Sequence, residues 1–332
     1  MGPDGVHTYW SNELPPRLTV RPGDTVTFET LDSSYGRIAR EIDELAQPGA
    51  DPDLLALISA GAYPEQSTMD HAAILARGHP LTGPVAVAGA EPGDTLAVEI
   101  LRVDVADWGF TACSSDPDRL GLLNDYLDED AGSYVHIWDL RGGVETQLRP
   151  GIRIPIDPFC GIMGVAPDEP GQHSTVPPRR NGGNLDLRHL TAGATLYLPV
   201  LVPGALLSLG DAHAAQGDGE VCGTGIETAA EVTVRLNLIS GGAPIPAPRL
   251  VTPDRPLSIP GPYHVAVGCE PDLREAARTA VRGTIDHLTA EHGLSRPEAY
   301  VLCSVCVDLK ISQLVDMPNY TVGAYLPLGI FA

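Results

Sequence analysis

Apolar and polar residues alternate in several short segments of the chain, which is the pattern of half-buried β-strands. These segments cover residues 17–20, 25–29, 95–101 and 230–239. Pro-Gly pairs at 22–23, 92–93 and 203–204 stand just before such segments or before the apolar run 206–209. Pro-Gly suits the centre of a type II turn, whose second residue needs a positive φ. Repeated strand–turn–strand units predict a β-sandwich or barrel-like body rather than alternating βα units.

Helical periodicity is confined mainly to the C-terminal part of the chain. Apolar residues recur near a 3.6-residue period over 271–291, and His292-Gly293 supplies a stop. Ser295-Arg-Pro-Glu298 has the form of a capping box and opens a second predicted helix through about residue 307, followed by a possible strand at 309–315. The sequence therefore predicts a β-rich α+β fold with a smaller C-terminal α+β part.

Two segments interrupt the β pattern. Residues 36–76 read as an insertion with short helices near 38–45 and 53–59, and the polar, Asp- and Gly-rich residues 113–135 read as a surface excursion. We expect a β-rich body over 1–240 that carries both excursions and the functional site, and an α+β part over 241–332 packed on it.

Composition narrows the possible functions. The 332 residues include 36 Gly and 31 Pro, which excludes a helical bundle. With 21 Lys and Arg against 43 Asp and Glu, the net charge is −22, so nucleic acid and membrane surfaces are excluded as partners. The first ten residues lack the features of a signal peptide, and the most apolar stretch, 196–209, contains two prolines and is too short to span a bilayer. We expect a cytoplasmic protein whose six cysteines are free thiols.

The densest group of chemically active residues lies between Gly210 and Glu220. Asp211, His213 and Glu220 stand there among several glycines. Carboxylate oxygens and an imidazole nitrogen are the donors that divalent metals use, and glycines let a loop bend around an ion. The alternative is an ordinary polar surface loop.

Three further motifs offer weaker signals. Asn181 and Asn184 flank a Gly-Gly pair and could line a carbonyl or oxyanion site, although an Asn-Gly hairpin turn has the same pattern. His79 precedes a proline, in extended backbone where it could act as a ligand or be an ordinary histidine. Cys160 lies between apolar and glycine residues and could be a nucleophile or a buried, inert thiol.

Taken together, the motifs resemble those of the acetamidase/formamidase family. The matching segments span nearly the whole chain: 22–29 leading to Asp32, 79–94, 157–167, 176–186, 193–227 and 308–316. The resemblance implies a β-rich α+β fold, homo-oligomers and hydrolysis of short amides, such as formamide or acetamide, to a carboxylate and ammonia. The segments 36–76 and 113–135 do not match and could reshape the substrate pocket.

The resemblance favours a metal site over a plain loop. Our leading hypothesis is a metal-activated water, with zinc as the expected ion and calcium or magnesium as alternatives. The ligands would come from Asp32, His79, Asp211, His213 and Glu220. Glu220 would also carry the proton from water to the leaving ammonia, with Asn181 and Asn184 as further catalytic residues. Glu227 would orient a ligand.

Two rival hypotheses remain open at this stage. A thiol amidase would use Cys160, Glu220 and Lys310, the only lysine of the chain. A non-catalytic β-protein would bind a metal for structure alone, with all coordination positions filled by side chains.

Overall fold

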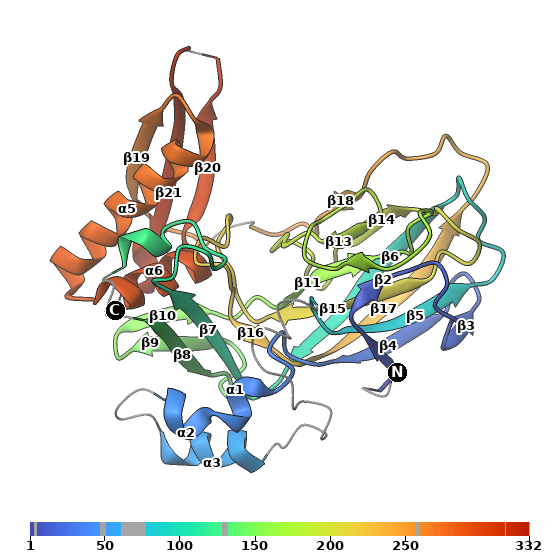
Figure 1. Cartoon of the computed structure of the whole chain (residues 1–332), viewed down its shortest axis with the longest axis horizontal. Coiled ribbons are helices and arrows are strands. Elements are labelled where there is room, and N and C mark those ends of the chain that lie inside the picture. The colour runs from blue at the N-terminus through green and yellow to red at the C-terminus, as the bar shows by residue number, and fades with distance from the viewer. Residues whose placement is uncertain are drawn as a thin grey trace.

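The structure is a computed structural model that describes residues 1–2, 5–46, 51–60, 78–127, 132–256, 259–315 and 317–331. A β-sandwich forms its larger part (Figure 1). One layer is an antiparallel five-stranded sheet in the order β18 (Arg249–Val251), β14 (Thr195–Pro199), β6 (Thr95–Val105), β17 (Ala230–Ile239) and β4 (Thr25–Thr30).

The second layer belongs to a nine-stranded sheet. Its main path runs through β1 (Val6–His7), β5 (Leu81–Val87), β15 (Leu207–His213), β16 (Glu227–Thr228), β7 (Trp108–Ser114) and β8 (Ser133–Asp139). Off this path, β11 (Phe159–Gly164) pairs with β15 and with β13 (Gly182–Asn184), while β3 (Leu18–Val20) runs parallel to β5. Short pairs join β9 (Glu145–Arg149) to β10 (Ile152–Pro155), and β2 (Tyr9–Trp10) to β12 (His173–Ser174).

Alternating side chains explain why these segments form a sandwich. In β4, Val26, Phe28 and Thr30 are buried while the three alternate residues of the strand are exposed. Apolar side chains from β5, β11 and β15 meet those of the five-stranded sheet in one core. Burial of a residue such as Phe28 contributes about 1.5–3 kcal/mol to folding. The predicted β-rich body is therefore confirmed.

The Pro-Gly turns have the predicted conformation. Gly23, Gly93 and Gly204 have φ angles of 95°, 101° and 80°. The backbone N–H of Asp24 donates to the carbonyl oxygen of Arg21 at 3.0 Å, closing the first of these turns.

The C-terminal part is α+β, as predicted. It contains a three-stranded antiparallel sheet in the order β19 (Tyr263–Glu270), β21 (Tyr320–Pro327) and β20 (Asp308–Gln313). This sheet packs against α5 (Leu273–His292). The remaining elements of this part are α6 (Arg296–Cys306) and the 3₁₀ turn η5 (Leu328–Ile330). Gly293 ends α5 in a left-handed conformation, and Ser295 and Glu298 form the predicted capping box of α6. The division of the chain near residue 240 stays a prediction.

The described parts of the two excursions lie beside β7 and β8. Helices α1 (Arg37–Arg40), α2 (Ile42–Leu45) and α3 (Pro52–Ala60) pack on β7 and β8 through a small apolar core, which confirms the predicted short helices. The second excursion joins β7 to β8 and contains the 3₁₀ turn η3 (Asn124–Tyr126). Residues 47–50, 61–76 and 128–131 of these excursions lie outside the described residues.

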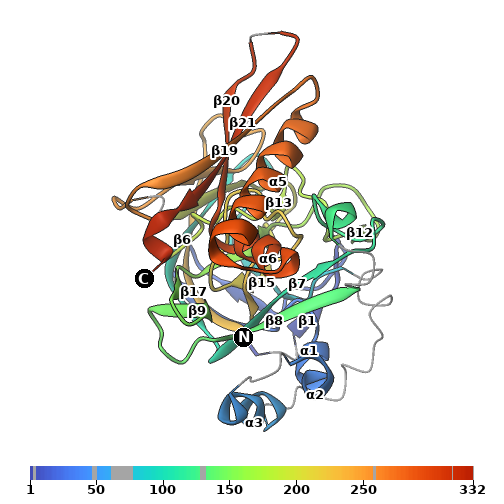
Figure 2. The ribbon, with the colours of Figure 1, turned by 90° about the vertical axis from the view of Figure 1, so that its left-hand side faces the viewer.

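Figures 1 and 2 place the C-terminal sheet and helices α1–α3 at opposite ends of one side of the molecule, with β7 and β8 between them. Within the described part of the chain, no helix is both long and apolar enough to span a bilayer.

Candidate active site

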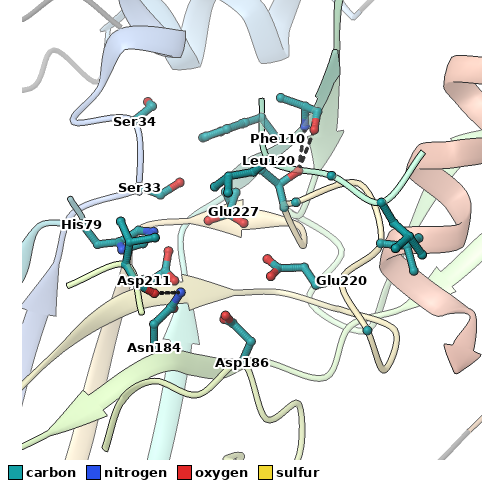
Figure 3. Close-up of a pocket in the computed structure, with 18 of the residues that line it drawn as sticks. Ser33, Ser34, His79, Phe110, Leu120, Asn184, Asp186, Asp211, Glu220 and Glu227 are labelled. Carbon is teal, nitrogen blue, oxygen red and sulfur yellow. Dashed lines mark hydrogen bonds between the residues drawn. The ribbon is translucent and has the colours of Figure 1, made fainter. Parts of the chain in front are cut away.

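Residues of α1, β7, β15, β16 and α5, and of the segments that follow β7 and β15, line a cavity of about 510 Å³. Four acidic residues line it: Asp186, Asp211, Glu220 and Glu227. Their side chains come from different elements and converge on one region (Figure 3). This convergence of buried acids makes the cavity the strongest candidate for the functional site.

Strand pairing brings the acids to His213. Asp211 and His213 lie in the last three residues of β15, and His213 is paired with Glu227 of β16. The segment from 210 to 220 is therefore not one continuous loop: its first part is strand and only the remainder turns back toward the cavity. Glu220 follows on that turn, and Asp186 follows β13.

The surroundings of His213 select one tautomer of its ring. Its Nδ1 lies 2.8 Å from Oε1 of Gln216, whose Nε2 donates to the carbonyl oxygen of Asp186 at 3.0 Å. Because that Gln216 atom is an acceptor, Nδ1 carries the proton and Nε2 faces the acids. The Nε2 atom is 3.0 Å from Oε1 of Glu227 and 3.6 Å from Oδ1 of Asp211.

Three of the four acids have an unusual backbone conformation. Asp186, Asp211 and Glu220 have φ angles of 45°, 57° and 42°. This left-handed region is rarely adopted by residues other than glycine, asparagine and aspartate, and such strain concentrates at functional sites. At Asp186 the backbone N–H donates to the carbonyl oxygen of Gly161 at 3.1 Å, which helps to hold the conformation.

Gly161 makes room for two of the carboxylates. A Cβ atom at this position would lie 2.6 Å from Oδ1 of Asp186 and 2.9 Å from Oδ2 of Asp211. Both distances are too short for any other residue type, so glycine is required here for the two aspartates to approach each other.

The acids influence one another strongly. Burial, followed by the negative charge of Asp211, raises the pKa of Asp186 to about 7. Burial and the charge of Asp186 raise the pKa of Glu220 well above its ordinary value. Burial of Asp211 acts in the same direction, but the charges of His79 and His213 outweigh it and lower the pKa of Asp211. Burial would lower the pKa of His213, yet Glu227 and Asp211 raise it instead. The site thus concentrates negative charge that a cation would neutralise.

The donor set fits a divalent metal. Two groups of three residues have ligand atoms within 4.8 Å of one another: Asp186, His213 and Glu220, and Asp211, His213 and Glu227. Among the described residues, Oδ1 of Asp186 and Oε2 of Glu227 are buried with no hydrogen-bond partner. Buried oxygens normally have a partner, and metal coordination would supply one.

The structure brings some of the other predicted residues to this cavity. His79 and Asn184 line it, although neither metal-binding group includes His79. Asn184 donates through Nδ2 to the carbonyl oxygen of Val176 at 3.0 Å, and its buried Oδ1 has no partner among the described residues.

Two predicted residues lie outside the lining. Asn181 uses its Nδ2 to donate to the carbonyl oxygen of Val165 at 2.6 Å and is 1% exposed, so its amide stabilises the backbone rather than facing the cavity. Asp32 is also buried, and its Oδ1 accepts hydrogen bonds from the backbone N–H groups of Ser34 at 2.8 Å and Gly36 at 3.3 Å. It positions the turn that carries Ser33 and Ser34 into the lining, while its Oδ2 has no partner among the described residues.

The three residues of the thiol hypothesis are not assembled. The Cys160 side chain belongs to the sandwich core, and burial, with the charge of Asp211, raises its pKa to about 12. Lys310 is exposed on β20, and its Nζ lies 4.6 Å from the centre of the Tyr325 ring. Neither residue lines the cavity that contains Glu220.

Asp186 is the residue of the site that sequence reasoning missed. It stands two positions after Asn184, in a motif that had been singled out for its asparagines. Its left-handed φ and its closeness to Gly161 depend on the pairing of β11 with β13. The sequence shows only an aspartate shortly after a Gly-Gly turn. Aspartates are common near turns, so this pattern alone does not identify a metal ligand.

Known proteins resemble this chain over most of its length. The model of the "Acetamidase/Formamidase family" matches residues 64–174 and 168–332. A formamidase of Methylophilus methylotrophus is 28% identical over 98% of this chain and 89% of its own length. An acetamidase of Mycolicibacterium smegmatis is 29% identical over 71% and 66% of the two chains.

Solved structures agree with these matches. A gamma lactamase from Delftia acidovorans has a TM-score of 0.79 at 27% identity, covering 99% of this chain and 90% of the other. An acetamidase from Bacillus halodurans has a TM-score of 0.61 at 30% identity, with 99% and 97% covered. The chain belongs to the acetamidase/formamidase family, and it is an amidase-type hydrolase that acts on linear amides.

Proposed function

We propose that this protein hydrolyses short primary amides to a carboxylate and ammonia, using water activated at the acid cluster around His213. The observation that carries the proposal is the pair of overlapping donor groups that share His213 inside one cavity. The names of the relatives, formamidase, acetamidase and gamma lactamase, support cleavage of an amide C–N bond.

The donors suit a zinc ion better than calcium or magnesium, because they combine an imidazole with carboxylates. His213 would be the central ligand, with Asp186, Asp211, Glu220 and Glu227 supplying oxygens. His79 lines the same cavity and could add a second imidazole, whereas Asp32 would act through the turn at Ser33 and Ser34. When bound, a divalent cation polarises an amide carbonyl and lowers the pKa of water.

Glu220 is suited to proton transfer. It lines the cavity, and burial and the charge of Asp186 raise its pKa well above that of an ordinary carboxylate. In our proposal it accepts a proton from the attacking water and donates it to the departing nitrogen, since an amide nitrogen leaves readily only when protonated. Oδ1 of Asn184, which has no partner among the described residues, would accept a hydrogen bond from the amide NH₂ group of the substrate.

The direct test is release of ammonia from formamide, acetamide and larger amides by purified protein, before and after dialysis against a strong chelator. Activity that disappears on dialysis and returns with zinc supports the proposal. Full activity in metal-free protein would remove the metal from the mechanism, and no activity toward any amide would contradict the proposed function. We also propose a homo-oligomer, which light scattering after size-exclusion chromatography would test.

A further inference from the structure

The cavity is much larger than the smallest amides require. Its volume is about 510 Å³. Acetamide, with four non-hydrogen atoms, would leave most of this space to solvent. Cavities of this size are typical of sites that enclose considerably larger ligands.

An apolar wall forms part of the lining beyond the acids, which also includes Ser33, Ser34, Arg37, Thr224 and Arg274. Side chains from β7, α5, β20 and the segments that follow β7 and β15 form this wall. Its members are Phe110, Leu120, Leu122, Val221, Ala277 and Leu309. Figure 3 shows Phe110 and Leu120 on the opposite side of Glu227 from Asp211 and Asp186, so these apolar side chains lie away from the two aspartates.

Leu120 is the most informative residue of this wall. This residue is 57% exposed although it lines the cavity. The loop that carries it is well ordered by hydrogen bonds: Nδ2 of Asn124 donates to the carbonyl oxygens of Asp116, Arg119 and Leu120 at 3.0, 3.0 and 3.1 Å. The exposure of Leu120 is therefore built into the loop.

The next residues tie the same loop to the C-terminal helices. The backbone N–H of Leu123 donates to the hydroxyl oxygen of Tyr300 in α6 at 2.7 Å. The guanidinium of Arg278 in α5 donates to the carbonyl oxygen of Leu122, and the backbone N–H of Leu122 donates to Val221 at 2.8 Å. These contacts fix the apolar wall relative to the acids, as substrate selection requires.

We propose that, among the linear primary amides this protein hydrolyses, those with an apolar acyl group of about five or more carbons are preferred over formamide and acetamide, and that Leu120 is a specificity-determining residue. This inference rests on the proposed function, because it places the carboxamide at the acid cluster. The acyl chain would extend along Phe110 and Leu309 and cover Leu120. Acetamide would reach the acids but leave the wall in contact with water.

The first test is kcat/KM for formamide, acetamide, butanamide and hexanamide with the zinc-loaded enzyme. Each buried methylene should increase kcat/KM about fourfold until the wall is filled. If kcat/KM stays constant or falls as the acyl chain becomes longer than that of acetamide, the inference is wrong, although amide hydrolysis itself would still be supported. If no amide is hydrolysed, the proposed function has failed. The role of the apolar wall can then be tested separately by calorimetry, which compares the affinity of the protein for hexanoate with its affinity for acetate. Weaker binding of hexanoate than of acetate would overturn the inference about the wall.

The second test compares two exposed positions. Leu120→Ser should lower the ratio of kcat/KM for hexanamide to that for acetamide by roughly tenfold, because it removes apolar contact with the chain only. Val144→Ser is the matched control, since Val144 is 75% exposed and lies outside the cavity lining. This control should leave the ratio unchanged. Equal losses on both substrates in Leu120→Ser would show that Leu120 does not select for chain length.

Discussion

Nε2 of His213 and Oε1 of Glu227 are 3.0 Å apart, and the two side chains are only 1% and 3% exposed. Oε1 of Glu227 also accepts a hydrogen bond from the backbone N–H of Gly225 at 2.9 Å, which holds this carboxylate in place beside His213. Glu220 differs, because it lies in the segment that follows β15 and not in a strand. We expect the two glutamates to have different tasks: Glu227 helps to hold the metal and His213 in place, and Glu220 transfers the proton.

Replacement of each glutamate should separate these tasks. We expect Glu220→Gln to lower kcat by about 10²–10⁴-fold, because general acid–base catalysis contributes that much. Glu227→Gln should keep measurable activity, with a loss of about 10–100-fold that follows from weaker positioning of His213. Steady-state kinetics with circular dichroism to check folding would measure both. Glu231→Gln, on the exposed face of β17, is the control, and the reverse order of effects would contradict the assignment.

Asp186 should contribute to metal binding although the sequence did not single it out. Zinc at a hundred times its dissociation constant should stabilise the wild-type protein by about 2.7 kcal/mol, seen as a higher Tm in calorimetry. Asp186→Asn should weaken zinc binding at least about tenfold and reduce this shift. Asp254→Asn, an exposed change outside the cavity lining, should behave like wild type. Equal zinc affinity in Asp186→Asn and wild type would remove Asp186 from the site.

Gly161→Ala should displace the carboxylates of Asp186 and Asp211 without replacing either residue. The new Cβ would lie 2.6 Å from Oδ1 of Asp186, so the carboxylate must move. Misplacement of catalytic groups by about 1 Å can cost about 10²-fold in rate, and we expect a loss of kcat/KM of that order. Gly242→Ala provides the control, because nothing lies within 4 Å of a Cβ there. Unchanged kinetics in Gly161→Ala would show that the aspartates need not lie so close.

Cys160→Ala should retain most of the activity. The thiol is buried in the sandwich core, and its raised pKa keeps it protonated and unreactive at neutral pH. Iodoacetamide should accordingly leave the folded enzyme active, and mass spectrometry should show Cys160 unlabelled. Inactivation in step with labelling of Cys160 would restore the thiol hypothesis. Loss of thermal stability alone in Cys160→Ala would be a packing effect and not a catalytic one.

Stability should fall in mild acid because of buried neutral histidines. Burial lowers the pKa of His136 to about 4, below the value of about 6.5 in the unfolded chain. Between these values the unfolded state binds the proton first, so the free energy of unfolding is fully retained above about pH 6.5 and decreases as the pH falls toward 4. His136→Phe should show a shallower decrease than wild type in urea titrations from pH 7 to 4.5. Parallel curves for the two proteins would contradict the assignment.

Much of the fold follows from local pattern. Alternation of buried and exposed residues in β4 and β17, positive φ at the Pro-Gly turns, and the capping box at Ser295 are all properties of short segments. A short segment contains enough information for such features because its own backbone geometry and hydrogen bonds define them. The same holds for Asp211 and His213, which lie two residues apart at the end of one strand.

Tertiary structure decided which side chains meet. Asp186 reaches the acids because β11 pairs with both β13 and β15, which places Gly161 under two aspartates. Asn181, three residues from Asn184, is instead turned into the sandwich, where it bonds to Val165. The sequence by itself determined the elements, the residue types and the family resemblance. The convergence of ligand atoms within a few ångströms depends on strand register and on the left-handed backbone at Asp186, and both are set by long-range packing.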